Sequence, residues 1–226
     1  MALAVNDTPE FRLPADVRYL AIEGVIGVGK SSLAKIVAER GNARLMQEQF
    51  EENPFLDKFY QDRRAYAFQT QLFFLLSRHK QFAEQFSQQD LFRPFTVTDH
   101  TFDKDRIFAR ATLDDAEMAL YSRVADVLER DVAKPDFVVY LQADVEVLMQ
   151  RIRKRGRHME RDIDPGYLRE LIALYNEHFF RYRECPVLIV NTNSIDFVEN
   201  NDDLEMLLDR IQTVPPGISA FIPESR

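Results

Sequence analysis

The fold is decided by residues 19–32, which read YLAIEGVIGVGKSS. The apolar run from Tyr19 to Glu23 ends at a glycine and suits a buried β-strand. Residues 24–31 then match the pattern G-x-x-x-x-G-K-[ST] without a mismatch, and a helix is expected from Lys30 to about Arg40. A strand, a glycine-rich turn and a helix in this order predict a loop that binds the phosphates of a nucleotide.

Each residue type in this loop has a chemical reason. Glycines let consecutive backbone N–H groups turn toward phosphate oxygens, and the helix directs its positive end at the same place. Lys30 can reach the β- and γ-phosphates, and Ser31 can hold Mg²⁺. The sequence lacks the guanine-reading Asn-Lys-x-Asp and the apolar run ending in Asp-Glu that mark many switches and motors. We therefore expect ATP and Mg²⁺ as cofactors, with the nucleotide bound by Gly24, Val25, Ile26, Gly27, Val28, Gly29, Lys30, Ser31 and Ser32.

Composition restricts the partners and the compartment. The 226 residues carry a net charge of −8, which argues against a nucleic-acid polymer, and no apolar run is long enough to span a membrane. The N-terminal residues have no secretion signal, and the single cysteine, Cys185, rules out an intrachain disulfide. We expect a soluble cytoplasmic protein with one domain, residues 17–213, between a disordered N-terminal arm, residues 1–16, and a C-terminal tail, residues 214–226.

Strand and helix patterns alternate along the domain. Strands are expected at residues 19–23, 44–46, 95–98, 137–141 and 187–190. Helices are expected at residues 30–40, 54–60, 64–89, 114–132, 145–154, 165–183 and 204–211. This alternation predicts a three-layer α/β fold of the P-loop kinase type, with a central, mostly parallel sheet of about five strands and a helical bundle on one side.

A basic segment near the middle of the chain narrows the class of nucleotide-binding protein. Residues 151–157 read RIRKRGR, with five cations in seven positions. Helix geometry places Arg151 and Arg155 on one face, and Gly156 lets the chain turn so that Arg157 points back toward them. Guanidinium groups stabilise the charge that phosphoryl transfer spreads over oxygen atoms, so the segment suits a lid. The alternative is a solvated basic helix end, which is less consistent with an acidic chain that carries a phosphate loop.

Several motifs together resemble the deoxynucleoside kinase family, which includes deoxyadenosine, deoxyguanosine and deoxycytidine kinases and is distantly related to thymidylate kinase. They are the phosphate loop, Glu48, residues 53–60 (NPFLDKFY), residues 68–71 (FQTQ) and the basic segment. The similarity extends from about Tyr19 to Arg210. It implies that the protein transfers the γ-phosphoryl group of ATP to the 5′-hydroxyl of a deoxynucleoside, and that it forms a homodimer through long helices.

The resemblance also implies roles for single residues. Glu48 matches the general base, although the family usually has Glu-Pro where this chain has Glu48-Gln49. Gln69 matches the glutamine that pairs with the base, and Tyr60 and Glu170 match the pair that binds the 3′-hydroxyl. The implied catalytic set is Glu48, Lys30, Arg151, Arg155 and Arg157. The implied substrate-binding set is Glu48, Tyr60, Phe68, Gln69, Asp105 and Glu170, with Phe68 equally interpretable as a core aromatic.

One segment departs from the family pattern. Family members commonly have Glu-Arg-Ser or Asp-Arg-Ser after the third strand, whereas this chain has Asp99-His100-Thr101. Asp99 keeps a carboxylate that can bind Mg²⁺ together with Ser31, but the arginine is missing. Either Arg106 or Arg78 can supply a guanidinium instead, and His100 is either a replacement or a structural histidine.

Substrate choice also stays open. Asp105 matches a position beside the base, but Leu76 occupies the place of its basic partner, so Asp105 can equally pair with Lys104 or Arg106 on the surface. The amide of Gln69 can pair with adenine, guanine or cytosine by rotation, and a purine deoxynucleoside, chiefly deoxyadenosine, is preferred by resemblance to bacterial members.

Two other functions remain as alternatives. One is a thymidylate-type nucleoside monophosphate kinase, although the carboxylate of Glu48 suits a hydroxyl acceptor better than a phosphate. The other is a nucleotide-binding regulatory protein that has lost catalysis, which the missing arginine makes conceivable.

Overall fold

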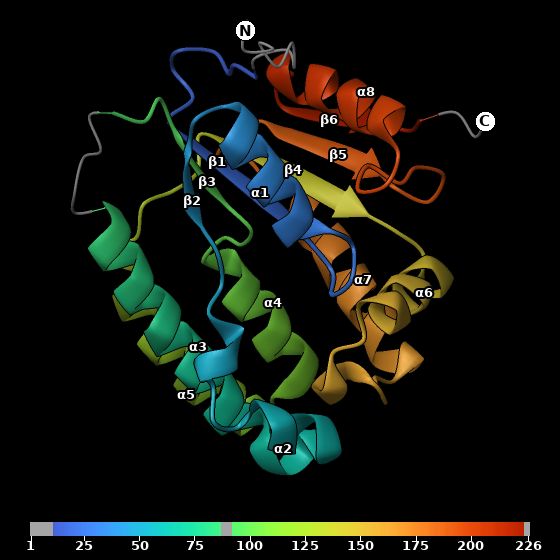
Figure 1. Ribbon diagram of the computed structural model, residues 1–226. Coiled ribbons are helices and arrows are strands. Elements are labelled where there is room, and N and C mark those ends of the chain that lie inside the picture. The colour runs from blue at the N-terminus through green and yellow to red at the C-terminus, as the bar shows by residue number, and fades with distance from the viewer. Residues whose placement is uncertain (1–10, 87–91, 224–226) are drawn as a thin grey trace, which may run out of the picture.

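The computed structural model describes residues 11–86 and 92–223, and a single parallel β-sheet lies at its centre (Figure 1). Within these residues six strands pair in the order β2-β3-β1-β4-β5-β6. Their bounds are β1 (Tyr19–Gly24), β2 (Arg44–Met46), β3 (Thr96–Thr98), β4 (Phe137–Gln142), β5 (Val187–Asn191) and β6 (Ile218–Phe221). The central strands β1, β4 and β5 are mostly apolar and buried along their length without polar alternation, because both faces of a parallel sheet are covered.

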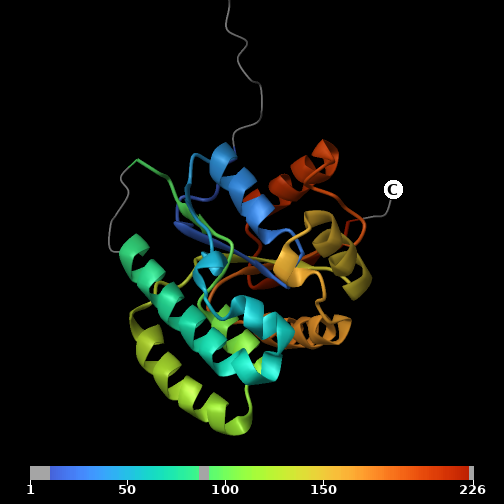
Figure 2. The same ribbon diagram turned by 60° about the horizontal axis from the view of Figure 1, so that its bottom comes forward.

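Helices cover both faces of this sheet and complete the three-layer α/β fold. Figure 2 shows α1 and α8 on one side and the group of α3, α5 and α7 on the other. The helix bounds are α1 (Lys30–Arg40), α2 (Leu56–Gln61), α3 (Arg63–Phe86), α4 (Asp103–Thr112), α5 (Asp115–Leu128), α6 (Val145–Arg155), α7 (Pro165–Phe179) and α8 (Asn201–Gln212). Three short 3₁₀ helices lie at Phe50–Glu52, Glu129–Asp131 and His158–Glu160.

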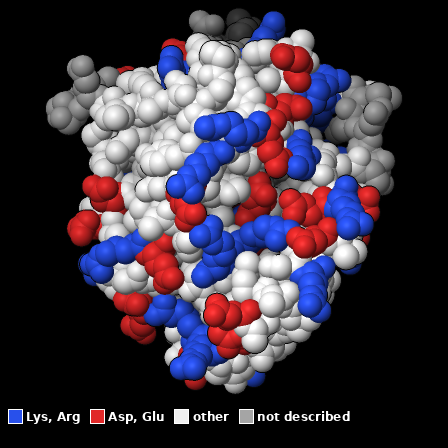
Figure 3. Space-filling view, turned by 180° about the vertical axis from the view of Figure 1, so that it is seen from behind, with Lys and Arg blue, Asp and Glu red and all other residues white. Residues whose placement is uncertain are grey.

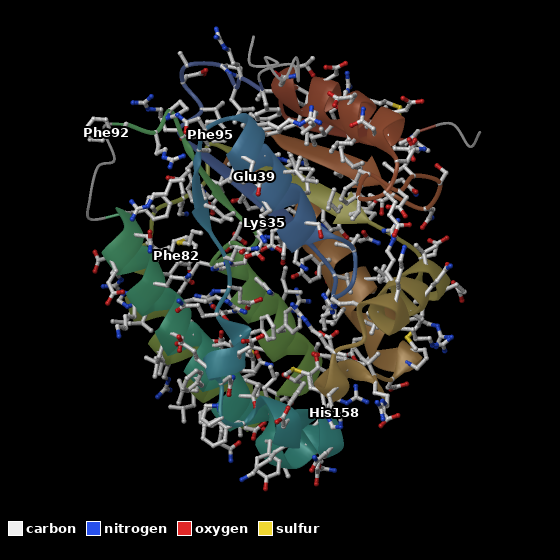
Figure 4. The ribbon with its side chains drawn as sticks, viewed as in Figure 1. Lys35, Glu39, Phe82, Phe92, Phe95 and His158 are labelled. Atoms are coloured by element: carbon white, nitrogen blue, oxygen red, sulfur yellow. The ribbon has the colours of Figure 1, made fainter. Side chains whose placement is uncertain are left out.

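The long helix α3 is anchored to the sheet and to a second helical layer. Phe82 is almost fully buried and packs against the rings of Tyr19 on β1 and His100 beyond β3 (Figure 4). Leu75 joins Tyr121 of α5 in a smaller apolar cluster, and Phe68 and Leu72 pack against this cluster from a neighbouring part of the helix surface. The helix is therefore packed on two sides, as its broad apolar pattern predicted. One of its faces points toward the edge of the sheet where the site forms.

Local signals explain where several elements begin. Asp114 caps α5 by accepting from the backbone N–H of Glu117, whose side chain accepts from the N–H of Asp114 in return. This capping box confirms the helix start that was read from Asp114. Helix α6, which carries most of the basic segment, ends at Gly156, and this glycine adopts a left-handed conformation with φ of 69°.

Three features differ from the sequence-based expectation. The sheet has six strands among the described residues and not five, because Ile218–Phe221 pairs parallel to β5 inside the segment expected to be a tail. Phe11, in the expected arm, is buried against the ring of Phe95. Helix α4 was not expected, although acidic residues in its first turn and Arg110 in its last turn mark such a helix. Residues 1–10 and 224–226, and the expected end of the long helix at 87–89, lie outside the described residues.

The distribution of surface charge and the hydropathy of the helices bear on the expectation that neither nucleic acid nor a membrane is a partner. Figure 3 shows acidic and basic side chains interspersed over the described part of the face opposite that of Figure 1. Across residues 11–86 and 92–223, no helix combines the length and apolarity needed to cross a membrane.

Candidate active site

The phosphate loop lies at the carboxyl end of β1, in the middle of the sheet. Gly24 has φ of 146°, and a Cβ there would come within 2.4 Å of the carbonyl oxygen of Leu141 on β4. Gly29 has φ of 109°, and a Cβ there would come within 2.7 Å of the ring of Phe197. Both positions therefore require glycine for backbone conformation and for space. The loop sits next to the point where the strand order reverses between β1 and β3, the usual ligand site of such sheets.

Lys30, Ser31 and Asp99 meet at the mouth of this loop. Lys30 Nζ donates to the carbonyl oxygens of Gly24 at 2.7 Å and Val25 at 3.1 Å, so the loop curls around its ammonium group. Burial, reinforced by the like charge of Lys104, lowers the pKa of Lys30 to about 8. An anionic phosphate placed here would restore the charge of Lys30, which suits the expected nucleotide site.

The expected metal ligands are also side by side. Ser31 Oγ donates to Asp99 Oδ2 at 2.5 Å, and Asp99 Oδ1 lies 3.2 Å from His100 Nδ1. Burial opposes the charge of Asp99, but the hydrogen bonds from His100 and Ser31 lower its pKa to about 2. A hydroxyl and a charged carboxylate next to a phosphate loop fit Mg²⁺, which prefers oxygen ligands and usually binds through few protein groups.

The basic segment folds as a lid beside the loop. Arg155 pairs with Glu160, and the Arg157 guanidinium lies 4.0 Å from the ring centre of Phe50. Both arginines line two neighbouring cavities, one bordered by Arg151 and Lys154 of α6 and the other by Glu48, Tyr60 and Gln71. We call these the lid cavity and the inner cavity.

Arg151 has a different environment. Its guanidinium donates to the carbonyl oxygens of Val28, Thr192 and Ile195 and to the hydroxyl of Thr192, at 2.7–3.3 Å. It therefore ties the phosphate loop to the segment after β5. Ser32 completes the lid cavity, which is lined by Gly27, Val28, Gly29, Lys30, Ser31, Ser32, Arg151, Lys154, Arg155, Arg157, Asp196, Phe197, Val198 and Glu199.

Glu48 lies just past β2 with its carboxylate at the inner cavity. Arg78 donates to Oε1 through Nε at 3.1 Å and through Nη2, and Lys104 Nζ donates to Oε2. Burial alone would raise the pKa of Glu48, but the two cations outweigh it and hold the pKa well below its usual value. Its backbone N–H donates to Asp99 Oδ1 at 2.9 Å, which places the two carboxylates at adjacent strand ends.

The structure resolves the two alternatives for Asp105 and for the missing guanidinium. Asp105 is fully buried and pairs with Arg78, and it does not lie on the surface. Arg106 pairs instead with Asp126 and Glu129, away from Glu48. The basic partner of Asp105 is therefore Arg78. It lies two positions after Leu76, which was the expected partner position and is 49% exposed.

The same offset of two residues affects the expected base-binding glutamine. Gln69 is exposed and does not line the inner cavity, whereas Gln71 is 2% exposed and does. Phe68 packs in the small cluster between α3 and α5, as the core interpretation held. The stripe of Ala67, Leu75 and Phe82 faces inward, and Gln71 and Arg78 lie on it.

Tyr60 lines the inner cavity, but Glu170 is exposed and lies outside it. The acidic residue that shares the cavity with Tyr60 is Glu160, which is 4% exposed and held by Arg155 and Arg157. Burial raises the pKa of the Tyr60 hydroxyl, and the charge of Glu160 adds to this effect, so the hydroxyl stays protonated and can donate.

Sequence reasoning thus missed Gln71, Lys104 and Glu160 as cavity residues. A usable signal existed for Gln71 and Arg78, since they are polar residues on the otherwise apolar stripe of a long helix. Glu160 follows Arg157 by three positions, the spacing at which an acidic residue can pair with a lid arginine.

Known proteins with a similar sequence share one family. Residues 20–215 match the family described as deoxynucleoside kinase. The chain belongs to this family. Its activity is therefore the phosphorylation of a nucleoside. The two alternatives, a nucleoside monophosphate kinase and a regulatory protein without catalysis, are not favoured.

Relatives and solved structures agree with this assignment. The deoxyguanosine kinase of Bacillus subtilis (strain 168) is 34% identical over 198 residues, covering 86% of this chain and 96% of that protein. The deoxyadenosine/deoxycytidine kinase of the same organism is 30% identical over 205 residues, covering 86% and 92%. The structure of the deoxyadenosine kinase from M. mycoides with bound dATP has the same fold, with a TM-score of 0.74 at 24% identity over 85% of this chain and 98% of that chain.

Proposed function

We propose that this kinase uses ATP and Mg²⁺ to phosphorylate the 5′-hydroxyl of a purine deoxynucleoside held in the inner cavity. The observation that carries the proposal is the position of Glu48, a charged carboxylate in a cavity that also contains Lys30 and the lid arginines. A carboxylate in hydrogen-bond reach can orient a hydroxyl and accept its proton during transfer. It would repel an acceptor that already carries a phosphate.

The donor groups follow from the phosphate loop and the lid. Ser31 and Asp99 would hold Mg²⁺, which when bound neutralises charge on the nucleotide phosphates. Lys30 contacts the phosphates inside the loop, and Arg155 and Arg157 stabilise the group in transfer because they line both cavities. Arg151 holds the loop in place through its four contacts to backbone and hydroxyl oxygens.

The acceptor groups come from α2, α3 and the 3₁₀ helix that follows the lid. We assign base pairing to Gln71, whose amide both donates and accepts, and 3′-hydroxyl binding to Tyr60 and Glu160. Arg78 and Asp105 form a buried ion pair behind the base site. The purine preference is supported by similarity to relatives named deoxyguanosine kinase and deoxyadenosine kinase, whereas a third is named for both a purine and a pyrimidine nucleoside.

The assembly and compartment extend the same proposal. Leu76, Leu120 and Val127 are 49%, 53% and 62% exposed on α3 and α5, and large exposed apolar side chains on adjacent helices favour a second copy as partner. We propose a cytoplasmic homodimer joined through these helices. A mass in solution that equals one chain at all concentrations would contradict the dimer.

The deciding experiment is ATP consumption with each of the four deoxynucleosides and their ribose counterparts, with and without Mg²⁺. We expect the highest kcat/KM with a purine deoxynucleoside and no turnover without the metal. Faster turnover of a deoxynucleoside monophosphate than of its nucleoside would overturn the hydroxyl-acceptor assignment.

A further inference from the structure

The segment after β3 lacks an arginine, yet the structure places a second cation on Glu48 from another element. Lys104 stands in the first turn of α4, is 6% exposed and lines the inner cavity. Lysine is rarely buried unless it is paired, because removing an ammonium group from water is costly. Its burial at this place therefore indicates a partner that needs it.

That partner is Glu48. The two carboxylate oxygens are divided between two cations, since Oε1 accepts from Arg78 and Oε2 accepts from Lys104. Arg78 is also committed to Asp105 through Nη1, which fixes its guanidinium. Without Lys104, Oε2 would have no charged donor to fix the rotation of the carboxylate.

Lys104 also lies close to the phosphate loop. Lys104 and the loop residue Lys30 line the same inner cavity. The ring of Phe108, one turn further along α4, lies 5.6 Å from Lys104 Nζ and limits where the side chain can go. Lys104 is thus held between the carboxylate of Glu48 and the site of the donor phosphates.

We propose that Lys104 is a positioning residue for phosphoryl transfer and supplies the second cation on Glu48, beside the guanidinium of Arg78. It fixes the Glu48 carboxylate so that a remaining lone pair faces the substrate hydroxyl. The role rests on the proposed function, since it presumes Glu48 as the base, but it adds a residue on α4 that the sequence pattern after β3 does not contain.

The test compares Lys104→Met, which keeps the length and loses the charge, with Lys104→Arg, which restores it. We expect Lys104→Met to lower kcat by roughly 10–100-fold and to leave both KM values nearly unchanged, because misplacing a group costs rate and not ground-state binding. Lys104→Arg should recover most of the lost kcat. The matched control is Lys134→Met, whose lysine pairs with Glu184 on the surface and should not matter.

Other outcomes separate this inference from the proposed function. Equal losses of kcat in the Met and Arg variants, or a raised KM with unchanged kcat, would overturn the role of Lys104. Absence of turnover in the wild-type enzyme would instead contradict the proposed function. In that case crystal structures of wild type and Lys104→Met decide the point: a rotated Glu48 carboxylate in the variant supports positioning, and an unmoved one refutes it.

Discussion

The two halves of the site are built in different ways. The donor half is centred on one continuous segment, residues 24–32, to which Asp99 and the lid arginines are added from elsewhere in the chain. The acceptor half gathers Tyr60, Gln71, Lys104 and Glu160 from α2, α3, α4 and the lid. In a short motif, the sequence alone determines which residues contact the ligand. In a cavity made from several helices, this depends on which face of each helix points inward.

This difference explains which residues the sequence located correctly. The phosphate loop, Glu48 and Asp99 lie at or just past the ends of strands, where the pairing of neighbouring parallel strands fixes the position of each residue. Gln69 and Glu170 were placed by motif likeness on helices, and a shift of two positions on α3 moves a side chain from the cavity to solvent. The following experiments test that contrast in order of expected effect.

The donor half should be the most sensitive. Lys30→Ala should lower kcat by roughly 10²–10³-fold, because it removes the charge that contacts the transferring phosphate. Steady-state kinetics and a thermal unfolding scan would be measured together. A folded variant that keeps most of its kcat would show that this half does not depend on its motif lysine.

Glu48 tests the residue where the two halves meet. Glu48→Gln keeps the size of the side chain but loses the base and one of the two acceptor oxygens, so kcat should fall by roughly a hundredfold, with little change in ATP binding. The control is Glu51→Gln, because Glu51 is exposed and does not line the inner cavity. If both variants behave alike, Glu48 is not the base.

The acceptor half offers a direct comparison on one helix. Gln71→Ala should weaken deoxynucleoside binding by about 1–3 kcal/mol, since a buried polar partner of the base is lost. Gln69→Ala, two positions earlier and exposed, should change binding little. Titration calorimetry with the preferred deoxynucleoside measures both. The reverse order of effects would mean that the register of α3 is wrong.

The smallest effect concerns pH and Lys30, whose pKa is about 8 in the protein alone. Anionic phosphates favour the charged lysine, so ATP binding raises this pKa and takes up a proton. Affinity is full below pH 8 and is lost as the pH rises through it, by up to about tenfold between pH 7 and 9. Calorimetry at pH 8.5 in buffers of different ionisation enthalpy would detect the proton uptake, and a pH-independent affinity would contradict it.

Most of the fold was predictable because the strands β1, β4 and β5 at the centre of the sheet are largely apolar runs. Five of the strands and α1 begin within a residue of the expected position, and the parallel arrangement followed from the alternation of elements. Helix α4 was missed because Lys104, Asp105 and Arg106 look like part of a polar loop. In the structure each forms an ion pair that the sequence does not reveal: Lys104 with Glu48, Asp105 with Arg78, and Arg106 with Glu129 just after α5. β6 was missed because its four residues gain strand structure only by pairing with β5.

The strand order also has a kinetic consequence. β1 carries the phosphate loop, yet its neighbours are β3 and β4, with Leu20 opposite Phe137. Contacts so distant in sequence cost loop-closure entropy before they are repaid, and sheets of this kind fold slowly. During synthesis, β1 can pair with β3 before β4 exists, but it gains its second neighbour only when β4 has left the ribosome, so the apolar strand that carries the phosphate loop stays incompletely paired for more than half of translation and can be bound by chaperones.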